Sequence, residues 1–297
     1  MMQTSITTFR YFSIRSAIPR IAGANWMDIN PELNLWLNLI FRWVHVFAAI
    51  MWVGTTYYFT WLDARLHEEE KSGGDEKAQV WMVHSGGFYV VEKEKRPGTR
   101  SLHWFRWEAA MTWISGFLLL TLMAYLGGGS GIVDPDVLDI KGSTAILIGI
   151  GTLVVGWVVY DLLVRSPLGR NEILFAVVAY ILVVGATYGL THVLSGRWAY
   201  LHLGAMFGTI MVSNVWMRIL PAQKRMIAAT KEGREVDARL GARAKLSSKH
   251  NTFMVVPTVF LMISNHYANT YGSRYNWIIA SVLILLGWIA AKFIRRA

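Results

Sequence analysis

The chain has 297 residues, of which 54% are hydrophobic and 14 are tryptophan, while only 16% are charged. This balance is too apolar and aromatic for a typical soluble domain; it predicts a membrane protein whose net charge of +10 lies in loops beside membrane lipid rather than on a nucleic-acid-binding surface. Because the chain has no cysteine, the sequence excludes a disulfide framework, a thiolate metal site and a covalently attached heme c.

Residues 1–34 carry scattered arginines without the apolar core of a signal peptide, so we predict an N-terminal surface segment there. Residues 35–297 then form one transmembrane domain, because a span needs about 20 mainly apolar residues and seven windows qualify. No window has the alternation of a strand, which predicts an all-α bundle of about seven, at most eight, membrane-spanning helices. The windows are Leu35 to Leu62, His103 to Leu126, Ser143 to Leu163, Glu172 to Leu194, Tyr200 to Leu220, Phe253 to His266 and Trp277 to Ile294. The sixth is short and contains Pro257, so we expect it to be kinked or to extend back toward His250.

Lysine and arginine gather in alternate connections between these windows. The connections after the first, third and fifth windows are basic, whereas those after the second, fourth and sixth are poor in Lys and Arg. Because basic connections stay in the cytoplasm, this pattern predicts an N-terminus outside and a C-terminus inside.

Ionisable residues within membrane spans are candidates for function, because hydrocarbon disfavours them. The predicted orientation sorts them into two layers. The outer layer holds a histidine on each of four helices, namely His45, His192, His202 and His266. The inner layer holds His103, Trp104, Trp107, Glu108, Asp161, Arg165, Asn214, Arg218, His250 and Asn251.

Four imidazoles at similar depth suit a b-type heme with two axial histidines. His45 is the first axial candidate, because Arg42, His45 and Trp52 share one helical face and would place a cation beside a heme propionate. The second ligand would be His192, His202 or His266. The alternative is that each histidine is an interfacial residue with a satisfied ring.

The inner layer predicts a pocket for a flat, anionic heterocycle. If residues 103–108 are helical, Trp104 with Glu108 and His103 with Trp107 would present a carboxylate, an imidazole and two stacking surfaces. The candidate catalytic residues are Glu108, His103 and His250. The candidate substrate contacts are Trp104, Trp107, Arg165, Asn214, Arg218 and Asn251. The alternatives are an aromatic belt with snorkelling charges and, for Asp161 with Arg165, a structural ion pair. Neither layer has the clustered ligands of a zinc or di-iron site.

Several stretches resemble the membrane-bound urate oxidases of bacteria. They include RWVHVFAAIMWVG from Arg42, LHWFRWEA from Leu102, VYDLLVRSPLG from Val159, YGLTHVLSGRW from Tyr188 and KHNTFMVVPTVFLMISNHY from Lys249. The LHWFRWEA and SNHY blocks are the most specific of these.

This resemblance implies a bacterial inner-membrane enzyme that oxidises urate to 5-hydroxyisourate, takes the new oxygen from water and passes two electrons to cytochrome c. Members of that family typically continue into a C-terminal cytochrome c domain, whereas this chain stops at Ala297 without any cysteine. We expect either that a separate cytochrome c or respiratory complex serves this chain or that the chain has been shortened. Two other functions remain open: a non-catalytic heme-binding accessory subunit and a transporter for a purine or another anion.

Overall fold

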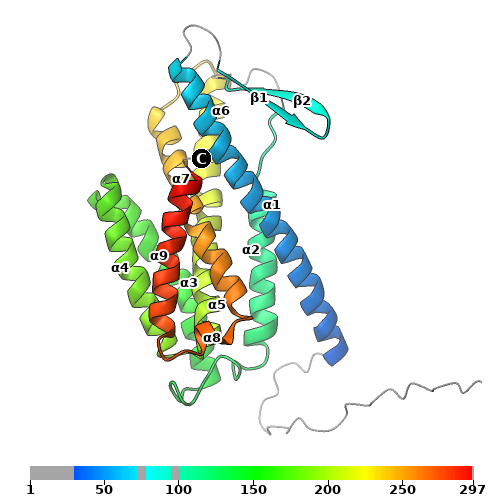
Figure 1. Ribbon diagram of the computed structural model, residues 1–297, viewed down its shortest axis with the longest axis vertical. Coiled ribbons are helices and arrows are strands. Elements are labelled where there is room, and N and C mark those ends of the chain that lie inside the picture. The colour runs from blue at the N-terminus through cyan, green and yellow to red at the C-terminus, as the bar shows by residue number, and fades with distance from the viewer. Residues whose placement is uncertain (1–29, 73–77, 95–100, 296–297) are drawn as a thin grey trace, which may run out of the picture.

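The computed structural model describes residues 30–72, 78–94 and 101–295, in which long helices form a bundle with one small β-hairpin at its end (Figure 1). Most of the predicted N-terminal surface segment therefore lies outside the described residues. The elements are α1 (Pro31–Ser72), β1 (Gln79–His84), β2 (Gly87–Glu92), α2 (Trp107–Leu120), the π-helical η1 (Thr121–Tyr125), α3 (Gly142–Arg165), the 3₁₀ turn η2 (Pro167–Arg170), α4 (Glu172–Thr191), α5 (Gly196–Ser213), the π-helical η3 (Asn214–Ile219), α6 (Leu220–Lys231), α7 (Ala238–Ser264), α8 (Ala268–Tyr271) and α9 (Asn276–Ile294).

Six helical segments of the described chain are long and apolar enough to cross a membrane. They are α1, α2 with η1, α3, α4, the continuous run from α5 through η3 to α6, and α9. Each corresponds to one predicted window. Most of the sixth window lies in α7, a 27-residue helix that begins at Ala238. This helix is not among the spans, because the polar residues Lys249, His250 and Asn251 directly precede its apolar half and leave the apolar run too short. A bundle of membrane-spanning type is thus the architecture that the apolar runs predict.

Pro257 lies inside α7, where its missing N–H and its ring would weaken an isolated helix. The helix tolerates it because α9 packs closely there. A Cβ on Gly287 of α9 would lie only 3.0 Å from the proline Cδ and 3.1 Å from its nitrogen. Because Gly287 has no side chain, α9 can pack closely against the turn of α7 where Pro257 lacks a backbone N–H.

The all-α fold class predicted from the sequence is confirmed, and the structure adds a two-stranded sheet in the connection between α1 and α2 that the sequence analysis did not predict. There β1 and β2 pair antiparallel, with Val83 opposite Phe88. Ser85 and Gly86 form the two-residue turn, with φ of 51° and 79°, as a hairpin turn of right-handed twist requires. The β-branched and aromatic residues on either side favour the strands.

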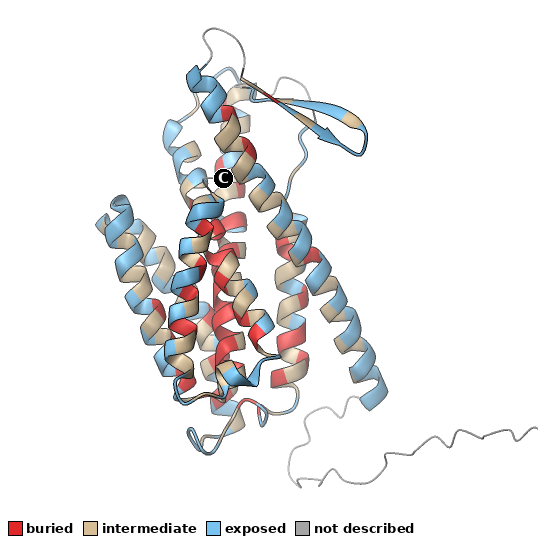
Figure 2. Cartoon of the chain, in the orientation of Figure 1, coloured by how far each residue is buried: buried red, intermediate tan, exposed pale blue. Residues whose placement is uncertain are grey.

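The core lies along α5, which packs against α2, α3, α4 and α7. Figure 2 shows the buried residues gathered on these facing surfaces, while α1 and α4 are covered by half-buried and exposed side chains. On α1, Trp43 is 72% and Ile50 65% exposed. Such apolar exposure is stable in lipid rather than in water, so the peripheral helices present the expected lipid-facing surface.

The basic connections meet at one end of the bundle, which we call the basic end: the hairpin, α6, the start of α7 and residue 295 lie there (Figure 1). Asp63 follows the apolar part of α1 and links the elements of the basic end. Its Oδ1 accepts from Lys93 Nζ at 3.0 Å, and its Oδ2 accepts from Lys245 Nζ at 2.8 Å. Partial burial raises the pKa of Asp63, but the hydrogen bonds and charges of both lysines outweigh this and hold it below its usual range.

Candidate functional site

Four polar side chains from α3, η3 and α7 form a hydrogen-bonded group inside the basic half of the bundle. The Asn214 amide donates to the Tyr160 hydroxyl at 2.8 Å and to Asn251 Oδ1 at 2.9 Å. The Tyr160 oxygen lies 2.8 Å from His250 Nδ1. The Asn251 amide donates in turn to the carbonyl of Met211 at 3.0 Å. Three residues of the predicted inner layer are therefore connected, and Tyr160, which the sequence analysis missed, joins them.

The direction of these bonds fixes where the protons lie. Both hydrogens of the Asn214 amide are used, so the tyrosine oxygen accepts one and its own O–H donates to His250 Nδ1. A neutral His250 then carries its proton on Nε2. The ring stacks on Phe175 of α4, with centroids 4.6 Å apart and planes inclined by 12°.

Asp161 binds two arginines beside this group. Arg218 of η3 pairs with one carboxylate oxygen, and Arg165 approaches the other at 2.7 Å. The Arg218 side chain is only 4% exposed, whereas that of Arg165 is 63% exposed. The predicted Asp161–Arg165 pair is present. Because both predicted anion-binding arginines have this carboxylate as a partner, their proposed contact with substrate stays a prediction.

The π-helical segment η3 places Asn214 and Arg218 on the side that faces α3 and α7. Its other side carries Val215, which packs with Leu220 against Ala109 of α2. The predicted inner layer is therefore two separate groups, with η3 between them: the polar group of α3 and α7, and the residues at the start of α2.

The start of α2 differs from the sequence prediction, because the helix begins at Trp107 and residues 101–106 are irregular. His103 and Trp104 therefore do not share a helical turn with Trp107 and Glu108. The irregular segment instead packs against α1, where Phe59 meets Phe105 with ring centroids 4.9 Å apart. As a result His103 and Trp107 are exposed, while Trp104 and Glu108 are half-buried.

Two charged side chains at this point have buried atoms without a hydrogen-bond partner among the described residues, namely Glu108 Oε2 and Arg106 Nε. Buried polar atoms are nearly always satisfied in folded proteins. The Arg106 guanidinium lies 5.5 Å from the Trp107 ring and 6.0 Å from the Trp104 ring. The sequence analysis missed Arg106, although its place between the two tryptophans of the LHWFRWEA block was visible.

The four outer histidines make contacts with different elements. His45 Nδ1 lies 2.8 Å from the carbonyl of Thr112 on α2. His202 is fully buried; its Nδ1 lies 2.7 Å from the Trp198 carbonyl, and its Nε2 lies 3.0 Å from the Tyr125 hydroxyl. His192 is exposed and bonds its own helix at the Tyr188 carbonyl, 2.7 Å away, and His266 is exposed at the end of α7.

No hydrogen bond or ring contact in the described part of the chain joins two of these histidines. Arg42 bonds Asn38 at 3.1 Å and Met123 Sδ at 3.3 Å. The His45 ring lies against Gly116, where a Cβ would come within 2.7 Å of Cε1. The heme, with His45 and a second histidine as ligands, therefore stays a prediction.

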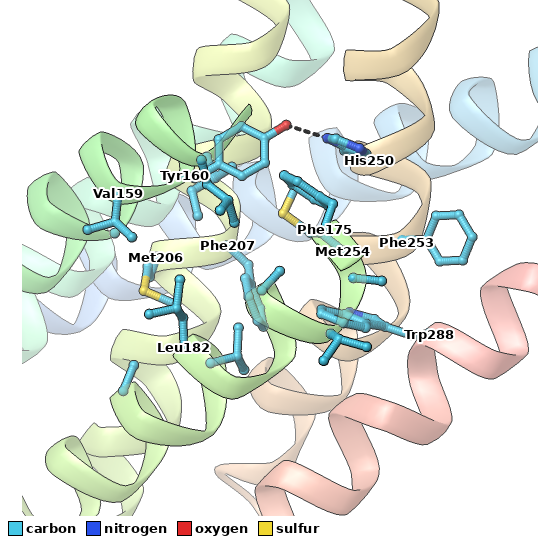
Figure 3. Close-up of a pocket in the computed structure, with 18 of the residues that line it drawn as sticks. Val159, Tyr160, Phe175, Leu182, Met206, Phe207, His250, Phe253, Met254 and Trp288 are labelled. Carbon is cyan, nitrogen blue, oxygen red and sulfur yellow. Dashed lines mark hydrogen bonds between the residues drawn. The ribbon is translucent and has the colours of Figure 1, made fainter. Parts of the chain in front are cut away.

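A cavity of about 1140 Å³ opens between α3, α4, α5, α7 and α9 (Figure 3). Most of its lining is apolar, including Val159, Leu182, Met206 and Phe207. Its polar part contains Tyr160, Glu172, Lys249, His250, Lys292 and Arg295. None of the four outer histidines lines it. Tyr160 and His250 thus belong to the buried polar group and also line this cavity.

One family model, described as urate oxidase N-terminal, matches residues 31–297. No curated protein and no solved structure matches the chain. Because the family match covers nearly the whole chain, the protein belongs to the urate oxidase N-terminal family, as its resemblance to that family predicts.

Proposed function

We propose that this chain is a membrane-bound oxidoreductase that converts urate to 5-hydroxyisourate with oxygen from water. The family match over residues 31–297 carries the proposal. Urate and one water yield 5-hydroxyisourate, two protons and two electrons, and we propose a cytochrome c as the partner that takes these electrons one at a time. The bacterial inner membrane, with the basic end in the cytoplasm, is the proposed location.

We place urate at the start of α2, where a cationic and an anionic side chain each have a buried atom without a hydrogen-bond partner among the described residues. A planar purine anion offers oxygen acceptors and N–H donors on its edge. It would supply the hydrogen bonds that buried Arg106 Nε and Glu108 Oε2 lack. Trp104, half-buried beside Arg106, offers a ring face for the heterocycle. This site keeps Glu108 and Trp104 from the sequence prediction and replaces Arg165 or Arg218 by Arg106 as the cation.

The chemistry needs a base and an anion-binding group in contact with the substrate. Glu108 would take a proton from the attacking water or from a urate N–H, and the guanidinium of Arg106, two residues before it in the chain, would hold the negative charge that develops on the ring. A heme b held by His45 would supply one-electron transfer chemistry. Proton transfer by Glu108 and anion binding by Arg106 do not depend on that group.

The test uses the full chain, purified and inserted in lipid nanodiscs, with urate under anaerobic conditions. Loss of the urate absorption band together with reduction of added ferricytochrome c is the expected result, and ¹⁸O from labelled water should appear in the product. Arg106→Lys should raise KM for urate more than it lowers kcat, because it removes a bidentate donor and keeps the charge. Folded protein that leaves urate unchanged with every acceptor would refute the proposal.

A further inference from the structure

We propose that the cavity between α3, α4, α5, α7 and α9 binds an isoprenoid quinone, with its ring at the Tyr160–His250 end and its tail along α4 toward the lipid. The quinone would be a second electron acceptor for this protein. Its role as an acceptor rests on the proposed urate oxidation, whereas its binding does not.

The size and lining of the cavity fit such a ligand. At about 1140 Å³ it exceeds the ~300–1,000 Å³ typical of pockets for drug-sized molecules, and it is much too large and apolar for urate alone. Residues of five helices line it, and Phe207, Met254 and Leu182 supply apolar side chains around its length (Figure 3). An amphipathic molecule with a long apolar body is the chemical class that would fill it.

Two side chains that line this space carry ring N–H groups without an acceptor among the described residues. Tyr160 donates to His250 Nδ1, so the second ring nitrogen carries the proton, and His250 lines the cavity. Trp288 also lines it, and its buried Nε1 has no hydrogen-bond partner among the described residues. A quinone carbonyl oxygen is the acceptor that such donors lack, and Phe175 and Phe207 supply aromatic rings to the lining.

The cavity is continuous with the lipid-facing surface of the bundle. Val155 of α3 and Val177 and Ile173 of α4 line it and are also 59%, 51% and 79% exposed. A tail of variable length can therefore leave between α3 and α4. A protein cavity closed on all sides would limit the ligand to one length.

A phospholipid is the competing occupant, since cations lie near the polar end. However, Lys249 already holds both oxygens of Glu172 at 2.7 Å, and Arg295 donates to Thr252 at 2.7 Å. Hydrogen-bond donors next to an aromatic face suit a neutral ring better than a phosphate. The structure therefore favours the quinone.

The electron and proton balance closes with this acceptor. Urate and water release two electrons and two protons on forming 5-hydroxyisourate, and a quinone takes up two of each to become the quinol. The proposed urate site and the cavity lie on opposite sides of η3, and packed helix axes are about 8–10 Å apart. Electrons would thus cross a single helix between donor and acceptor.

The binding test uses the purified full chain in nanodiscs of quinone-free phospholipid, titrated calorimetrically with decylubiquinone. We expect saturable binding at one site per chain. Ala179→Trp, which places an indole in the cavity, should weaken binding by more than about tenfold, because its bulk overlaps the ligand. Ile181→Trp is the matched control: Ile181 is on the same helix, 63% exposed and outside the lining, and binding should not change.

Trp288→Phe provides the second variant, because it keeps an aromatic ring and removes an N–H that has no described protein partner. Binding should weaken about fivefold, as for one lost hydrogen bond, with unchanged thermal stability. Absence of saturable binding, or equal affinity of wild type, Ala179→Trp and Trp288→Phe, would overturn the proposal. So would phospholipid that co-purifies with wild type, is lost from Ala179→Trp and is not displaced by decylubiquinone.

A final measurement separates this inference from the proposed function. Urate-dependent formation of decylubiquinol should be abolished in Ala179→Trp, which should still reduce ferricytochrome c with urate. Quinone binding without any urate oxidation would contradict the proposed function and leave the quinone site standing. Urate oxidation without quinone binding would contradict the quinone site alone.

Discussion

The ion pair between Asp161 and Arg218 offers a direct test of how the buried polar group is stabilised. Asp161→Asn keeps the size of the side chain and removes its charge, which leaves the guanidinium of Arg218, 4% exposed, without a counter-ion. Breaking a buried pair in this way typically costs about 3–5 kcal/mol. Arg165→Ala removes the other partner of the same carboxylate, but that side chain is 63% exposed, so its loss should cost at most about 1 kcal/mol.

The free energy of unfolding can be measured by titrating the protein in mixed micelles with SDS and following tryptophan fluorescence. Asp161→Asn combined with Arg218→Met should regain most of the loss, because no charge is then buried without a partner. Four values are compared: Asp161→Asn, Arg218→Met, their double variant and Arg165→Ala. If Asp161→Asn costs no more than Arg165→Ala, or if the double variant is the sum of the single ones, the reasoning is wrong.

Three further predictions concern the site, the packing and the basic end. Glu108→Gln should lower kcat for urate oxidation by about 10²-fold or more, because the variant loses the general base. Steady-state assays of correctly folded protein measure this, and an unchanged kcat would remove Glu108 from the mechanism. Gly149→Ala should lower the free energy of unfolding by about 1–3 kcal/mol, because the new Cβ would lie 2.4 Å from His202 Nε2. Gly151→Ala is the control: there is open space around this position, so the free energy of unfolding should not fall. Similar melting curves for the two variants would contradict this prediction. Because the pKa of Asp63 is lowered in the folded protein, its ion pairs stabilise above the unfolded pKa and this contribution is lost as pH falls. Asp63→Asn should therefore be less stable than wild type at neutral pH by under about 1 kcal/mol, and this difference should shrink as the pH falls and the wild-type carboxylate becomes protonated. A difference that stays constant on acidification would refute the assignment.

The apolar runs could predict the helices because burial in lipid requires uninterrupted apolar length, and this requirement is visible in one dimension. The same reasoning failed between α1 and α2. The hairpin residues Gln79 to Glu92 are short β-forming runs around a Ser-Gly turn, and each run is far shorter than the apolar length that identifies a span. Local preference, rather than length, identifies such an element.

The candidate site was predictable in composition but not in its pairing. Asn214, His250 and Asn251 were selected as polar residues at one depth, and the structure connects them. Tyr160 was missed because a tyrosine in an apolar run has an ordinary alternative as a lipid-interface residue. The pairing of Arg218 with Asp161 joins residues 57 positions apart, and such a contact follows from helix packing rather than from spacing along the chain.

The π-helical turn η3 also limits which changes of chain length this protein can tolerate. A π turn holds one residue more than the α-helical turn that would otherwise stand there, so the run from α5 into α6 contains a surplus residue at Asn214 to Ile219. Deleting one residue here would remove the surplus and let the helix continue regularly, so α6 would keep its direction while the spacing between Asn214 and Arg218 along the helix would change. Either Asn214 or Arg218 would then lose its partner across the bundle. The segment is therefore a place where length, and not only residue type, is constrained: single-residue deletions should be far less tolerated within η3 than in the loop between α6 and α7.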